Sequence, residues 1–196
     1  PDTRESSTAL YAQGEWLSER MSIVPGVRFD HFAVDVQSQD GFYPPAKLPG
    51  RSLSGSAASP KLAMLYRTTP NWSVFGQYAG GFRAPTANQV NGYYENSAEA
   101  VVIIPNPNLK PEKSRSVEFG VRGRLDSLNL DAAVFSSHFD NLIVENTFIS
   151  GAGTAASPKR FQTTNTDKAR IHGFELKGYQ HWGAAVGGKL GTPFTL

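Results

Sequence analysis

Long segments in which apolar and polar side chains alternate are the feature that most constrains this 196-residue chain. In Glu112–Arg124, the residues Arg115, Val117, Phe119 and Val121 share one parity. The positions between them are small or polar: Ser114, Ser116, Glu118, Gly120 and Arg122. A period of two residues indicates a β-strand with one apolar and one polar or small face.

Similar alternation recurs along the whole chain, in segments that are long for the strands of a globular sheet, which usually have about five or six residues. The only stretch that we expect to form a short helix is Thr86–Tyr93, and no apolar run is long enough for a membrane-spanning helix. The chain is therefore predicted to be all-β. The other predicted strand segments are Thr8–Leu17, Arg20–Val36, Ala57–Thr69, Trp72–Phe82, Leu128–Asn146 and Phe161–Trp182.

The links between these segments alternate in length. Short links are expected at 18–19, 70–71, 125–127 and about 183–184, and long links at 37–56, 83–111 and 147–160. Tight turns on one side and long loops on the other are typical of bacterial outer-membrane barrels. The pattern favours an antiparallel transmembrane β-barrel with its apolar side in lipid. A soluble β-sandwich is the alternative, although its connections usually mix lengths less regularly.

Three tryptophans support the barrel. Trp16, Trp72 and Trp182 each lie next to a short link and in phase with apolar residues of their strand. Indole combines an apolar body with a polar N–H group and settles at the membrane–water boundary. We expect the three rings to mark one rim.

Composition excludes several classes of function. Nineteen basic and seventeen acidic residues leave a net charge of +2, too balanced for a nucleic-acid-binding protein, and the absence of cysteine excludes disulfides and thiolate metal sites. No metal site is predicted, and the histidines are expected to be hydrogen-bonded strand residues: His31, His138, His172 and His181. No catalytic residue is predicted either. The carboxylates Glu118, Asp140, Glu145 and Glu175 are expected to line a polar lumen.

Two proline-containing motifs bracket the link at 83–111, namely 81–86 (GFRAPT) and 105–112 (PNPNLKPE). Proline fixes the backbone where the chain leaves and re-enters a strand, and Asn106 and Asn108 can hydrogen-bond nearby backbone and hold a turn. The guanidinium of Arg83 suits a carboxylate in a bidentate pair. That carboxylate is either a ligand group or one from the protein.

The two tetrads in these motifs resemble the FRAP and NPNL motifs of TonB-dependent outer-membrane receptors for haem and haemoglobin. The residues that match are Phe82, Arg83, Ala84 and Pro85, and Asn106, Pro107, Asn108 and Leu109. The resemblance extends over roughly residues 8–182. It implies a barrel of about 22 strands with an N-terminal plug, of which residues 1–196 form an incomplete segment of seven or eight strands. The plug is expected outside the chain, and the irregular pattern near Pro193 predicts an unfinished last strand.

The resemblance implies a function as well as a fold. It implies uptake of haem, or of haem from haemoglobin, across the bacterial outer membrane, driven by a TonB energy complex acting through the plug. Haem would be cargo, with no permanently bound cofactor and no enzymatic activity. A siderophore receptor and a soluble β-sandwich binding or adhesion module are the alternatives.

In haem receptors of this type the loop between the motifs usually supplies a histidine that ligates the haem iron. Residues 86–105 contain no histidine, and Tyr93 and Tyr94 lie there instead. Phenolate is an established type of haem-iron ligand. These tyrosines are expected either to ligate haem or to contact a partner's surface.

Overall fold

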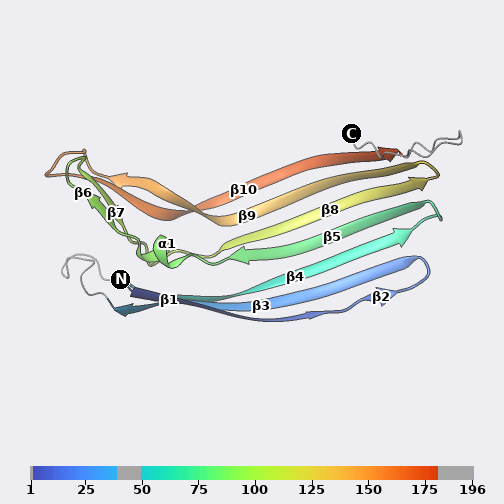
Figure 1. Ribbon diagram of the computed structural model, residues 1–196, viewed down its shortest axis with the longest axis horizontal. Coiled ribbons are helices and arrows are strands. Elements are labelled where there is room, and N and C mark those ends of the chain that lie inside the picture. The colour runs from blue at the N-terminus through green and yellow to red at the C-terminus, as the bar shows by residue number, and fades with distance from the viewer. Residues whose placement is uncertain (1, 39–49, 181–196) are drawn as a thin grey trace, which may run out of the picture.

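The computed structural model describes residues 2–38 and 50–180, which form one long, twisted sheet (Figure 1). Its wall consists of seven long antiparallel strands, the first of which is interrupted at residues 14–15. The prediction of seven or eight strands in an incomplete barrel is confirmed, because the sheet does not close. The wall strands are β1 Asp2–Gln13 with its continuation β2 Trp16–Leu17, β3 Met21–Ser38, β4 Leu53–Arg67, β5 Trp72–Arg83, β8 Glu112–Leu125, β9 Leu128–Ser150 and β10 Lys159–Gln180.

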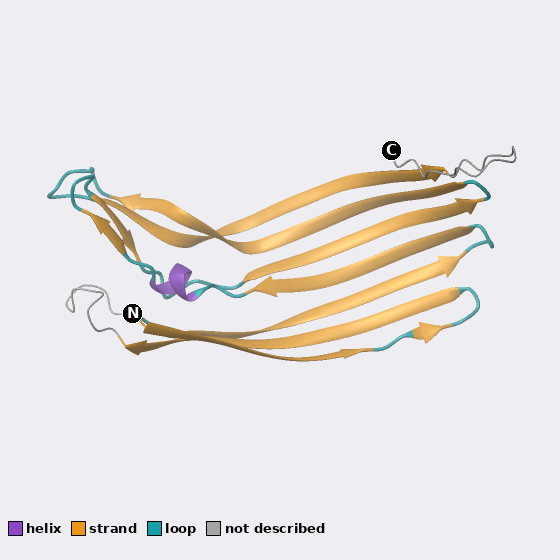
Figure 2. Ribbon diagram, viewed as in Figure 1, coloured by secondary structure: helices purple, strands orange, loops and turns teal. Residues whose placement is uncertain are grey.

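Consecutive wall strands are neighbours in the sheet, in the order β1–β3–β4–β5–β8–β9–β10. The tight turns gather at one end and the long connections at the other (Figure 2). The long connection between β5 and β8 contains a short helix and a small hairpin: α1 Ala87–Asn91, β6 Tyr94–Asn96 and β7 Val101–Ile104. The alternation of link lengths expected from the sequence is therefore present between the described strands, whereas the short link expected at about 183–184 lies outside the described residues.

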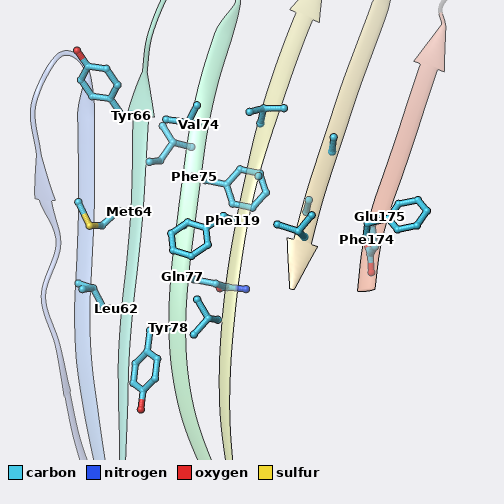
Figure 3. A pocket seen from close by; sticks show the side chains of 18 of the residues that line it. Leu62, Met64, Tyr66, Val74, Phe75, Gln77, Tyr78, Phe119, Phe174 and Glu175 are labelled. Atoms are coloured by element: carbon cyan, nitrogen blue, oxygen red, sulfur yellow. The ribbon is translucent and has the colours of Figure 1, made fainter. Parts of the chain in front are cut away.

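One face of the sheet is an apolar surface over the part that adjoins the tight turns. In the register of the sheet, Gly76, Phe119, Val134 and Phe174 lie side by side on β5, β8, β9 and β10. Phe119 is 61% exposed and Phe174 is 80% exposed, and Figure 3 shows the neighbouring side chains of this surface, which include Leu62, Met64, Tyr66, Val74 and Tyr78. Among the described residues no second sheet covers this face. The β-sandwich alternative is therefore wrong, because a sandwich would bury this face against another sheet.

The opposite face carries polar residues together with a few aromatic rings that lie over glycines. Gln77 donates a hydrogen bond to Glu118 (2.7 Å), and Arg122 forms an ion pair with Asp131 (2.6 Å). The Arg122 guanidinium also lies 5.5 Å from the centre of the Phe75 ring. Inward-facing polar groups of this kind are typical of a barrel with an aqueous interior.

The hairpin β9–β10 extends beyond the other strands at the long-loop end (Figure 1). Asn141 and Asn146 have positive φ angles of 58° and 56°, and the pairing with β10 shifts register near Gln162. Asparagine tolerates this left-handed conformation better than most residues, so the strand can bend and continue. The link expected at 147–160 is consequently shorter in the structure, because strand pairing continues to Ser150 and resumes at Lys159.

The extension also contains an arrangement that the sequence did not predict. β7 pairs with the first residues of β10 in parallel, from Val101↔Lys159 to Ile104↔Gln162. This pairing fixes the β6–β7 hairpin against the wall. It is an exception to the antiparallel sheet expected from the sequence.

The short helix predicted within Thr86–Tyr93 is present as α1. Within the described residues, no helix is both long enough and apolar enough to cross a membrane.

Trp16 and Trp72 lie at the tight-turn end, as expected, and are 55% and 39% exposed. Trp72 shares its face with Val74 and Tyr78, and Trp16 is paired with Ile23. Trp182 and the irregular segment around Pro193 lie outside the described residues.

Candidate functional site

Arg83 of the first motif and Glu112 of the second form a bidentate ion pair across two strands. Arg83 and Glu112 are opposite each other on β5 and β8, and Arg83 Nε and Nη2 each donate to a carboxylate oxygen of Glu112 at 2.7 Å. Glu112 Oε1 also accepts from the backbone N–H of Ile143 on β9 (2.8 Å). The carboxylate that pairs with Arg83 in the structure is thus one from the protein, which is the second of the two alternatives considered from the sequence.

The rest of the first motif starts α1. Pro85 is buried, and Thr86 caps the helix. The Thr86 hydroxyl accepts from the Gln89 backbone N–H (3.3 Å), while the Gln89 side chain accepts from the Thr86 N–H (3.2 Å). This reciprocal capping box satisfies two N–H groups that the helix itself leaves unpaired. Phe82, which precedes Arg83, lies 6.3 Å from Phe32 between ring centres.

The second motif is held by Asn106. Its Oδ1 accepts from the Asn108 backbone N–H (3.0 Å), and its Nδ2 donates to the Thr163 carbonyl on β10 (2.8 Å). The Asn106 side chain therefore holds a turn, as expected from its sequence position. Pro107 is half-buried, whereas Leu109 is only 2% exposed and anchors the motif in the small core at the loop end.

The two motifs meet at α1. The backbone N–H of Asn106 donates to the Val90 carbonyl at the end of the helix (2.9 Å), and Val90 is fully buried. Asn91 exchanges two hydrogen bonds with the backbone of Arg51, just before β4 (2.9 and 3.1 Å). Gln89 donates to Glu145 on β9 (2.9 Å). The FRAP and NPNL segments thus form one platform that joins β5, β8, β9 and β10, which we call the motif platform (residues 82–91 and 105–112).

Further contacts to the motif platform come from residues without a sequence signal. Asn165 on β10 accepts from the Lys110 N–H (2.8 Å) and donates to the Lys110 carbonyl (2.9 Å). Gln162 donates to the Pro105 carbonyl (2.7 Å). Glu112 is the last residue of the second motif, whereas the polar residues Gln162 and Asn165 lie in a long strand whose local sequence does not indicate such contacts.

The two loop tyrosines have different surroundings. The Tyr93 hydroxyl donates to Glu95 (2.5 Å), and this hydrogen bond, aided by partial burial, raises the pKa of Tyr93 to about 12. Tyr94 begins β6 and is 53% exposed. A phenolate ligand needs a deprotonated tyrosine, so the hydrogen bond to Glu95 opposes that role for Tyr93.

The other predicted residues are spread along the wall. His31 is hydrogen-bonded to Ser56 (3.0 Å) on the neighbouring strand, and His138 and His172 lie in β9 and β10, whereas His181 lies outside the described residues. In residues 2–38 and 50–180, His, Asp and Glu side chains form no group of three that could hold a metal ion.

Three of the four predicted lumen carboxylates do not lie on the apolar face, and one does. Glu118 and Glu175 alternate with outward-facing apolar residues, and Glu145 faces α1. Asp140 is on the same face as Arg115 and Val117, and it pairs with Arg115 (2.7 Å). Its prediction as a lumen residue is wrong, because the strand register places it on the apolar face, where a basic side chain neutralises it.

Comparison with known proteins places this geometry in a family. The family model described as "TonB dependent receptor-like, beta-barrel" matches residues 1–195. Among curated proteins, the chain is 30% identical to the hemin receptor of Yersinia pestis over 79% of this chain and 22% of that protein. It is 27% identical to the heme/hemopexin utilization protein C of Haemophilus influenzae over 90% of this chain and 26% of that protein.

The chain is also similar to proteins whose names give other ligands. It is 34% identical to the vitamin B12 transporter BtuB of Vibrio vulnificus over 50% of this chain and 13% of that protein. The chain therefore spans about a quarter or less of the length of these curated relatives.

Solved structures share the fold. The hemophore receptor HasR of Serratia marcescens superposes with a TM-score of 0.69 at 20% identity, over 89% of this chain and 32% of that chain. The copper transporter OprC gives the same TM-score at 18% identity, over 93% of this chain and 26% of that chain.

Proposed function

Since this chain belongs to the TonB-dependent receptor β-barrel family, we propose that it is part of the barrel wall of an outer-membrane receptor that takes up haem, or haem extracted from haemoglobin. The observation that carries the proposal is the similarity over most of this chain to relatives named as a hemin receptor and a heme/hemopexin utilization protein. The FRAP and NPNL tetrads add to it, because both are complete. In the whole receptor, the plug and the remaining strands lie outside residues 1–196.

The apolar face faces lipid in this proposal, and the polar face lines the interior. The apolar surface between the tight turns and the long loops carries Phe119, Val134 and Phe174, all strongly exposed. Exposed apolar area of this extent is stable only against lipid or another apolar surface. The tight turns lie on the periplasmic side and the long loops outside the cell.

Each predicted site residue then has a role. The motif platform holds the extracellular loops in place, so that Arg83 and Asn106 act on the ligand only through the loop that they position. Tyr94 supplies aromatic contact to haem or to the surface of a haem protein, as exposed tyrosines do at binding surfaces. A transport signal requires that ligand binding favours one arrangement of loops and plug over another.

Growth on defined iron sources tests the proposal. The full-length receptor is expressed in a bacterium that lacks its own haem receptors, with haem, haemoglobin or a ferric siderophore as the only iron source. We expect growth on haem or haemoglobin that is lost when TonB is deleted. Growth only on the siderophore would show that the receptor takes up a siderophore and not haem. Growth on haem without TonB would contradict TonB-dependent uptake.

Tyr94 provides the matched variants. Tyr94→Ala removes the ring and is expected to weaken haem-dependent growth and haem binding several-fold, while Tyr94→Phe keeps most of the contact. Tyr66→Ala removes a ring of comparable exposure, 44%, at the opposite rim and should leave binding unchanged. Equal binding by Tyr94→Ala and the parent receptor would remove Tyr94 from the ligand surface.

A further inference from the structure

A group of cations lies on the apolar face, directly beside the long loops. Two cross-strand rows on β8, β9 and β10 contain them: Lys113–Asp140–Lys168 and Arg115–His138–Arg170. Paired residues point to the same side of a sheet, so these side chains share the face of Val117 and Phe119. We call Lys113, Arg115, Lys168 and Arg170 the basic rim.

Charge in the basic rim is unbalanced. All four cationic side chains are exposed, and Asp140 is the one acidic residue in the two rows. Asp140 pairs with Arg115 at 2.7 Å, and the Arg115 side chain is still 62% exposed. Three further positive charges therefore point away from the protein, whereas the inward-facing Arg28 and Arg122 have carboxylate partners at 2.8 and 2.6 Å.

The rim also has a hollow. Lys113, Arg115 and Lys168 line a recess of about 1100 Å³, together with apolar groups that include Pro60, Tyr78 and Phe82. The recess lies where the pairing of β4 with β5 ends, at Lys61↔Ala79. From this point towards the long loops, β4 and β5 are no longer paired with each other. The wall is therefore hollowed beside the cations.

The face becomes apolar two rows below the basic rim. The row Val117–Ser136–His172 is mixed, and the apolar rows Phe119–Val134–Phe174 and Val121–Ala132–Leu176 follow it. Successive rows are about 7 Å apart along the strands. A ligand that fits this surface carries negative charge at one end and a long apolar part at the other.

We propose that the basic rim binds the phosphate groups of a phosphorylated lipid of the outer leaflet, with its acyl chains lying along Phe119, Val134 and Phe174. The orientation rests on the proposed function, which places the long loops outside the cell. Arginine and lysine bind phosphate through charge-assisted hydrogen bonds, and each basic residue near a membrane surface adds attraction to anionic headgroups. The lipid site lies on the opposite face of the wall from the inward-facing Glu118 and Glu175.

The test uses the full-length receptor in detergent and phosphorylated lipid A as the probe. Lys113→Gln, Lys168→Gln and Arg170→Gln are combined, and Arg115 is kept because it pairs with Asp140. The control combines Arg20→Gln, Arg67→Gln and Arg124→Gln, which remove the same charge from exposed residues at the tight-turn end. Native mass spectrometry measures bound lipid, and titration of the lipid gives the affinity.

We expect the rim variant to bind lipid A at least about tenfold more weakly than the parent receptor, and the control to bind like the parent. Dephosphorylated lipid A should bind weakly to all three proteins. Equal affinity of the rim variant and the parent, or equal binding of the dephosphorylated lipid, would overturn the proposal. Complete displacement by millimolar inorganic phosphate would also overturn it, since the site would then recognise free phosphate rather than a lipid.

Haem uptake separates this proposal from the proposed function. If the receptor binds lipid A through the rim but does not support growth on haem, the haem function is wrong and the lipid proposal stands. If the receptor supports growth on haem but the rim variant keeps full affinity for lipid A, the lipid proposal is wrong and the haem function stands.

Discussion

Arg83 and Glu112 form the last antiparallel pair of β5 and β8 before the chain leaves the sheet, and their side chains close that pair with two hydrogen bonds of 2.7 Å. The segment between them contains α1 and the β6–β7 hairpin, so this ion pair lies at the base of the loop. Because Glu112 also accepts from Ile143 N–H on β9, one carboxylate joins three strands. The first motif therefore acts where the loop begins.

Removing either partner of this pair should destabilise the receptor to different extents. Arg83→Ala removes a pair in which the arginine side chain is 48% exposed, and solvent screening limits the loss to about 1 kcal/mol. Glu112→Ala also leaves the Ile143 N–H without its carboxylate acceptor, so we expect a loss of about 2 kcal/mol. Urea unfolding of the refolded receptor in lipid vesicles measures both values.

Lys177→Ala is the control for this pair. Lys177 and Glu175 form an ion pair whose side chains are 57% and 55% exposed, and its removal should change stability by less than about 0.5 kcal/mol. Equal losses for Arg83→Ala and Glu112→Ala would contradict the role of the Ile143 hydrogen bond. A double variant whose loss equals the sum of both single losses would contradict the coupling of the two side chains.

Asn106→Ala is expected to loosen the second motif. The amide group both accepts from Asn108 N–H and donates to the Thr163 carbonyl, and Thr163 is buried. Losing both bonds should cost about 1–3 kcal/mol. Hydrogen exchange at the backbone amides of residues 108–110 should accelerate, whereas Asn108→Ala, at an exposed neighbour, should leave it nearly unchanged. Slow exchange in Asn106→Ala would show that the turn does not depend on this side chain.

Local patterns predicted the wall of this protein but not the contacts between its parts. Alternation over Glu112–Arg124 placed β8 within one residue of its observed end at Leu125, because each strand's apolar parity is set by its own sequence. The partners of Asn106 and Lys110 on β10 lie more than fifty residues away in sequence, and no local pattern specifies them. The prediction for Asp140 is wrong because a charged residue by itself indicates an aqueous environment. Its position in the sheet and its ion pair with Arg115 instead place it on the apolar face.

Gly120→Ala is expected to destabilise the sheet. A methyl group at Gly120 would overlap the Phe75 ring and lie 2.6 Å from the Ala132 carbonyl oxygen, closer than van der Waals contact permits. The backbone oxygen cannot move without breaking the β8–β9 ladder, so we expect a loss of about 1–3 kcal/mol in urea unfolding. Gly26→Ala is the matched control, because its nearest neighbours are 3.6 Å away. Equal stability of the two variants would contradict the close packing of Phe75 on Gly120.

Tyr93 should titrate at unusually high pH. The hydrogen bond to Glu95 and partial burial raise its pKa from 10.0 to about 12, which favours the protonated phenol in the folded protein. The stabilisation is therefore complete below about pH 10 and is lost as the pH rises towards 12. The difference in phenolate absorbance between the parent receptor and Tyr93→Phe measures this titration. Glu95→Gln should shift it towards pH 10, and an unshifted midpoint would remove Glu95 as the cause.

Trp72 provides the test of how the wall lies in the membrane. Its ring is 39% exposed on the apolar face, at the tight-turn end, and it lies over Gly123 in the register of β5 and β8. Such a position at the rim of the apolar surface corresponds to the headgroup region, where indole is most stable.

The difference in fluorescence between the parent receptor and Trp72→Phe in lipid vesicles isolates the signal of this ring. Lipids brominated near the headgroup should quench that difference more strongly than lipids brominated near the chain ends. Trp16→Phe should behave in the same way, because Trp16 lies at the same end and is 55% exposed. If the deeper bromines quench either ring more strongly, or if neither lipid quenches it, the apolar face does not meet the membrane with its tight-turn end at the boundary.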